Sequence, residues 1–95
     1  MSKGAILFET TGRAQGVFPA NGTDFSLEEL QGFVGGYIEV VHITENVIMV
    51  VNEDGKAQRL EPNGMATVLA KAHGAIFPHD YIAGKALICP SDMVK

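Results

Sequence analysis

One stretch of the chain decides the fold: residues 25–52 read FSLEELQGFVGGYIEVVHITENVIMVVN. Ser26, followed three residues later by Glu29, forms the Ser-Leu-Glu-Glu pattern of a capping box at the start of a helix. Four apolar residues then fall on one helical face: Leu27, Leu30, Phe33 and Val34. The pattern predicts a helix over 26–34 that ends at the following glycine pair.

The remainder of this stretch predicts a β-hairpin. Residues 37–43 and 47–52 are rich in β-branched and aromatic side chains, which favour strands, and Thr44-Glu45-Asn46 joins them tightly. Apolar residues occupy both faces of the two strands, so we expect both faces of the sheet to be covered. Two helices can cover one face, and the N-terminal segment or another subunit would then cover the other.

The segments on either side of the hairpin supply further strands. Residues 4–10 predict a strand, and Val17-Phe18 predicts a short one after a turn-rich segment. The Asp54-Gly55 turn is followed by residues 56–60, which we expect to form a third strand that pairs back onto the hairpin as a meander. Residues 82–89 predict the last strand, which Pro90 stops.

A second helix is predicted near residue 63. Asn63 is a good N-cap for a helix over 64–71. The expected apolar face of that helix consists of Met65, Val68, Leu69 and Ala72. The sequence thus predicts one α+β domain over residues 1–95, a small antiparallel sheet of about four to five strands with two helices packed on it.

Composition bounds the class of protein. The chain has 95 residues, which is one domain near the low end of what builds its own core. Hydrophobic residues make up 46% and charged residues only 19%. Low charge and the two-faced apolar hairpin together predict a homo-oligomer, most simply a two-fold dimer.

Charge and hydropathy exclude several partners. The formal net charge is −4 and the seven basic residues are scattered, so we expect no nucleic-acid binding. No apolar run approaches the roughly 18 residues of a membrane span, and the N-terminus does not resemble a signal peptide. The single cysteine cannot form an internal disulfide, so we expect a cytoplasmic location.

The sequence shows no catalytic motif. The pair His79-Asp80 resembles that of metal phosphohydrolases, but the further His and Asp ligands of that family are missing, which favours a surface loop. His42, His73 and His79 have no metal-ligand spacing, so we expect no metal and no cofactor. Cys89 lies in an apolar run and is expected to be a buried structural thiol. The chain is therefore predicted not to be an enzyme.

Five residues form the candidate ligand-binding set: Tyr37, Glu39, Arg59, Asn63 and Thr67. Tyr37 can stack on a base, and the planar guanidinium of Arg59 suits a phosphate. Asn63 and the free N–H groups after it can bind an anion, and Glu39 can accept hydrogen bonds from a sugar or base. Simpler alternatives stay open, namely a solvent-facing Glu39, an N-cap at Asn63 and an exposed helical Thr67.

Residues 25–41, 48–70 and 82–89 together resemble the domain of unknown function 3846 family of phages, plasmids and mobile elements. The resemblance implies a mobile-element context and no catalytic motif. We therefore expect a non-enzymatic phage or mobile-element accessory protein in the host cytoplasm. It would bind or sequester a small anionic ligand, such as a nucleotide immune signal, as an anti-defence sponge. The alternative is a protein–protein inhibitor of a host factor, and a small hydrolase comes third.

Overall fold

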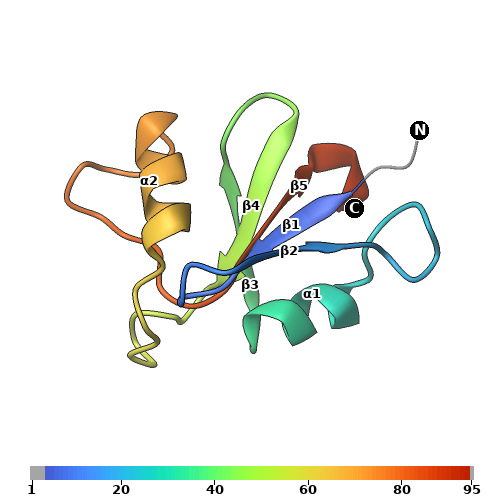
Figure 1. Ribbon diagram of the computed structural model, residues 1–95, viewed down its shortest axis with the longest axis horizontal. Helices are drawn as coiled ribbons and strands as arrows, with labels where there is room; N and C mark the ends of the chain where they lie inside the picture. The colour runs from blue at the N-terminus through green and yellow to red at the C-terminus, as the bar shows by residue number, and fades with distance from the viewer. Residues whose placement is uncertain (1–3, 95) are drawn as a thin grey trace.

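The computed structural model describes residues 4–94 as a five-stranded antiparallel sheet with the strand order β2-β1-β5-β4-β3 (Figure 1). The strands are β1 (Ala5–Phe8), β2 (Ala14–Val17), β3 (Ile38–His42), β4 (Val47–Asn52) and β5 (Ala86–Pro90). The helices are α1 (Leu27–Val34) and α2 (Gly64–Ala72), and a 3-10 helix covers Ser91–Met93. The α+β prediction is confirmed. Residues 1–3 and 95 of the predicted domain lie outside the described residues.

The capping box fixes the start of α1. The Oγ of Ser26 accepts the backbone N–H of Glu29 at 3.1 Å, and a carboxylate oxygen of Glu29 accepts that of Ser26 at 2.8 Å. The backbone N–H groups of Ser26 and Ala20 lower the pKa of Glu29. Gly35 ends the helix with a φ of 80°, a left-handed conformation that glycine adopts without strain. The predicted helix is confirmed.

Ser26→Ala should lower the free energy of unfolding by about 1 kcal/mol, because it removes the side-chain oxygen that accepts the Glu29 N–H. Urea unfolding followed by circular dichroism measures this loss. Ser26→Asp is the matched control, since aspartate caps helices as well as serine does. Equal losses in both variants would contradict a capping role for this oxygen.

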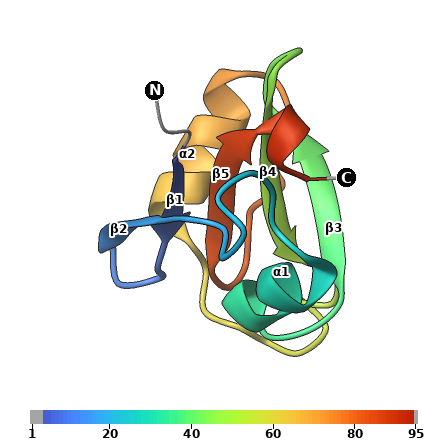
Figure 2. The same ribbon diagram turned by 90° about the vertical axis from the view of Figure 1, so that its right-hand side faces the viewer.

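The two helices lie on opposite faces of the sheet (Figure 2). On the α1 face the buried residues include Leu7, Leu30, Val34, Val50 and Leu87. On the α2 face they include Met49, Val51, Ala66, Ala70 and Ala86. Each helix thus covers one face, and the expectation that both cover the same face is wrong. The connection that leaves β4 carries the chain around to the opposite face before α2 begins.

The predicted strand over 56–60 is wrong. Residues 53–59 form consecutive turns, in which the N–H of Gln58 bonds Asp54 O at 2.8 Å and that of Leu60 bonds Gly55 O at 2.9 Å. β4 has no free edge for another strand, because β3 occupies one side and β5 the other. The meander is therefore replaced by a sheet in which β5, from the end of the chain, pairs beside β4.

The predicted face of α2 is also wrong in part. Ala66 and Ala70 are fully buried, whereas Met65 is 53% and Val68 is 67% exposed. Small side chains on the buried face let the helix axis lie close to the sheet. Of the larger apolar side chains of the predicted face, Met65 and Val68 are exposed, whereas Leu69 is partly buried against the core.

The last strand begins later than predicted, at Ala86 instead of residue 82. Gly84 has a φ of 86°, which interrupts an extended chain, and the backbone N–H and C=O of Ile82 bond to residues of the α2 region. β1 and β2 occur where strands were predicted, with shifted bounds. Neither α1 nor α2 has the length or apolar content of a membrane-crossing helix.

Candidate functional site

A trough runs along the α2 face of the sheet beside β3. It consists of two adjoining cavities of about 350 and 810 Å³, which share Glu39, Val41, Ile76 and Asp80 in their lining. The face of β3 forms one wall. Residues 53–57 and the loop 74–83 form the others. This surface, called the trough below, is the main concave site of the described residues.

Strand geometry places Glu39 at the trough. Glu39 pairs with Val51, and Val41 pairs with the buried Met49. Because paired residues point to the same side of a sheet, Glu39 and Val41 both face the α2 side. Val41, Val51 and Ile76 supply an apolar surface beneath the exposed carboxylate.

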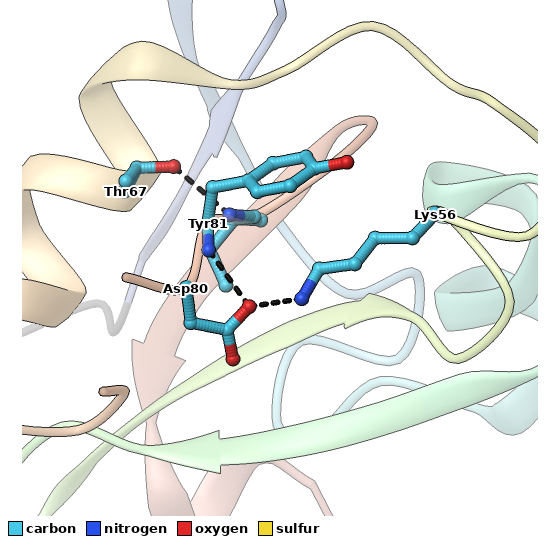
Figure 3. Close-up of polar contacts among 5 residues, drawn as sticks. Lys56, Thr67, Asp80 and Tyr81 are labelled. Carbon is cyan, nitrogen blue, oxygen red and sulfur yellow. Dashed lines mark hydrogen bonds and ion pairs between the residues drawn. The ribbon is translucent and has the colours of Figure 1, made fainter. Parts of the chain in front are cut away.

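Lys56 and Asp80 join two walls of the trough (Figure 3). The Nζ of Lys56 pairs with Oδ1 of Asp80 and lies 4.9 Å from the centre of the Tyr81 ring. The same Oδ1 accepts the backbone N–H of Tyr81 at 2.8 Å. The hydrogen bonds from Lys56 and Tyr81 lower the pKa of Asp80, so this carboxylate stays charged at neutral pH.

The wall that carries Asp80 is fixed to α2. Thr67 Oγ1 accepts the backbone N–H of Ile82 at 2.9 Å (Figure 3), and Ile82 O accepts that of Asn63 at 2.8 Å. The side-chain amide of Asn63 donates to Gly84 O at 2.9 Å and to Phe8 O at 3.0 Å. Its Oδ1 accepts the N–H of Ala66 at 3.1 Å. These bonds hold residues 82–84 against the start of the helix.

The smaller cavity of the trough is acidic. Four carboxylates line it: Glu39, Glu53, Asp54 and Asp80. One ammonium, that of Lys56, lines it as well, and Asp80 already neutralises that ammonium. The larger cavity adds His42 and Lys71 to the lining. A ligand that enters beside Glu39 and Asp54 therefore meets a negative surface.

The five predicted ligand-binding residues do not converge. Glu39 lines the trough, whereas the ring of Tyr37, 68% exposed, lines a separate cavity of about 260 Å³ with Gln31, Gly36, Asp54 and Gln58. Arg59 is exposed in a turn with a φ of 55° and lines neither cavity of the trough. Asn63 is fully buried as an N-cap, and Thr67 bonds Ile82. The structure therefore gives Asn63 and Thr67 bonds that hold the fold.

Sequence reasoning missed the pairing of Lys56 with Asp80. The two residues lie 24 positions apart, and no local pattern connects them. Phe77 and His79 of the same loop stack with ring centres 5.8 Å apart, on the exposed side. The interruption of an apolar strand by Glu39 was the one signal in the sequence that pointed to the trough.

Cys89 is buried in the fold, and His73 lies at the end of α2. Burial raises the pKa of Cys89 to about 11, so the thiol stays protonated at neutral pH. His73 ends α2, with its Nδ1 3.0 Å from Leu69 O. Within residues 4–94, no three His, Cys, Asp or Glu side chains are grouped as metal ligands would be.

Residues 6–93 match the family described as Domain of unknown function (DUF3846). The chain belongs to this family. The match covers every helix and strand of the fold except the first residue of β1, and it includes all the residues of the trough. No curated protein and no solved structure matches the chain. The DUF3846 family itself has no assigned function.

Proposed function

We propose that this protein is a non-enzymatic binding protein whose trough holds a basic side chain of a partner protein. The observation that carries the proposal is the lining of the smaller cavity, in which four carboxylates surround an apolar floor and the one ammonium, that of Lys56, is already paired. Arginine and lysine side chains match this surface, because they combine an apolar stem with a cationic head. The fixed wall of residues 80–84 provides a preformed binding surface.

This function corresponds to the protein-inhibitor alternative of the sequence analysis. An anionic ligand in the trough would face Glu39, Asp54 and an ionised Asp80, and like charges at close range oppose binding. A basic segment of a host protein fits the same charges. We place this activity in the host cytoplasm, as the family resemblance implies.

A peptide selection tests the proposal. Random heptapeptides displayed on a neutral carrier are selected on the immobilised protein, and the enriched sequences are measured by calorimetry as blocked peptides. We expect enrichment of a central arginine or lysine. Glu39→Gln should weaken the enriched peptides by about tenfold, the effect of losing one charge-assisted contact.

Glu28→Gln is the matched control, because Glu28 is an exposed carboxylate on α1, on the opposite face of the sheet. It changes the net charge equally and should leave binding unchanged. Enriched peptides without basic residues would contradict the proposal. So would equal affinity for wild type and Glu39→Gln.

A small nucleotide-like ligand is the second candidate, favoured by the exposed ring of Tyr37. That ring lies beside Gln31 and Gln58, whose amides can hydrogen-bond a base stacked on it. The same calorimetry with linear and cyclic nucleotides tests it. Tyr37→Ala should then cost roughly 1–3 kcal/mol of binding. Absence of any nucleotide binding to wild type would exclude this candidate.

A further inference from the structure

Among residues 4–94, β3 is an edge strand of the sheet, with β4 as its one neighbour (Figure 2). At its two ends, Glu53 N bonds Tyr37 O at 2.9 Å and Ile43 N bonds Val47 O at 3.0 Å. Bonded residues alternate along an antiparallel pair, so the backbone groups of Tyr37, Glu39, Val41 and Ile43 face β4. Those of Ile38, Val40 and His42 face outward.

β3 lacks most of the usual protections of an edge strand, since Glu39 is its one acidic or basic side chain besides His42. Its residues include no proline or lysine, and its register with β4 is unbroken from Ile38 to His42, without a bulge. Val40 is 36% exposed at the centre of the strand. The opposite edge, β2, is short and reads Ala-Gln-Gly-Val, with little strand propensity to support pairing. β3 is thus the edge better suited to a further strand.

We propose that β3 pairs with β3 of a second copy, antiparallel and about a two-fold axis at Val40. In this register Val40 lies opposite Val40 of the second copy, Ile38 opposite His42, and Glu39 opposite Val41. No two like charges are directly opposed, and each outward N–H and C=O of the three outward residues meets a partner. The sequence of β3 is therefore complementary to itself in the one register that satisfies its free backbone groups.

The pairing completes the trough. Val40 and His42, which offer their backbone to the second copy, also line the larger cavity, so the added strand lies along its open side. The two-fold axis of such a pair is perpendicular to the sheet, so both α2 faces point the same way. The two Glu39 side chains become diagonal neighbours, about 7–8 Å apart. If the proposed function holds, the dimer presents two acidic troughs side by side to a partner with two basic side chains.

Two variants that introduce opposite charges at Val40 test the pairing without any ligand. We expect sedimentation equilibrium of wild type to show a monomer–dimer equilibrium. Val40→Asp and Val40→Lys should each weaken it by roughly tenfold, because each places like charges face to face at the axis. An equimolar mixture of the two variants should recover the dimer, since opposite charges then meet. Recovery in the mixture also shows that both variants fold.

Cysteine cross-linking tests the register separately. Val40→Cys brings two thiols together at the axis, where Cα atoms of a bonded pair lie about 5.5 Å apart, within disulfide range. Diamide, as oxidant, should therefore cross-link Val40→Cys much faster than His42→Cys, the matched control. The native Cys89 is buried and does not compete.

Three outcomes would overturn the pairing while leaving the proposed function standing. The first is a monomer at every concentration. The second is a dimer that Val40→Asp does not weaken, as expected if the exposed Met65 and Val68 of α2 formed the interface instead. The third is equal cross-linking of both cysteine variants. Conversely, pairing without enrichment of basic peptides would overturn the proposed function alone.

Discussion

Asn63→Ala should lower the free energy of unfolding by about 3 kcal/mol, the largest loss expected from any single polar residue of the described chain. Asn63 is fully buried, and its side chain makes three hydrogen bonds to the backbone, at Ala66, Gly84 and Phe8. Removing the cap costs about 1 kcal/mol. Leaving two carbonyl oxygens without their donor adds about 1 kcal/mol each, the low end of the range for unpaired acceptors, because the bond to Phe8 O is only part-buried.

Asn63→Ser separates these contributions. Serine keeps an oxygen that can accept the Ala66 N–H, but it lacks the two amide donors. We expect its loss to be about 1 kcal/mol smaller than that of Asn63→Ala. Urea unfolding measures both variants. Full stability in the serine variant would show that the bonds to Gly84 and Phe8 contribute little.

The contacts of Asn63 show which part of its role could be predicted from the sequence. An asparagine before a helical pattern predicts an N-cap from local chemistry alone, and the structure confirms that cap. The bonds to Phe8 and Gly84 join residues 55 and 21 positions away. No local pattern reveals them. The interpretation of Asn63 as a ligand contact therefore could not be weighed against its bonds within the fold.

The same division between local and distant contacts runs through the fold. The capping box of α1 and the hairpin of β3 and β4 are encoded within a few residues, and both were predicted with nearly correct bounds. The neighbour of β4 on its other side is chosen by long-range pairing, such as Val50 with Leu87. The meander prediction depended on the Asp54-Gly55 turn, since residues 56–60, Lys-Ala-Gln-Arg-Leu, have little strand propensity, and for this reason it was wrong.

At the candidate site, one residue was predictable and its surroundings were not. Glu39 interrupts an apolar strand, and a carboxylate in that place calls for solvent or a partner. The acidic character of the trough arises from Glu53, Asp54 and Asp80, which come from two connections that fold over β3. Their assembly depends on where the turn 53–57 meets residues 80–84.

Gly55→Ala should disturb the contact between the turn 53–57 and residues 80–84. It should lower the free energy of unfolding by about 2 kcal/mol or more. A Cβ at position 55 would lie 2.7 Å from Ala83 O, a backbone atom, and 3.4 Å from the Cβ of Ala83. The wall cannot retreat easily, because the backbone N–H of Ile82 donates to Thr67 Oγ1 and its C=O accepts the N–H of Asn63. The turn 53–57 must move instead, which pulls Lys56 away from Asp80.

Gly32→Ala is the matched control, since Gly32 lies inside α1 and a Cβ at this position would have open space around it, with no neighbouring side chain within 4 Å. There the same change should stabilise the protein by about 1 kcal/mol, because alanine favours helix over glycine. Urea unfolding compares the two variants, and hydrogen exchange at the Tyr81 amide, which donates to Asp80, reports on the wall. We expect faster exchange in Gly55→Ala alone. Unchanged stability and exchange in that variant would mean that the turn and the wall are not in rigid contact, and the trough would then lose its preformed shape.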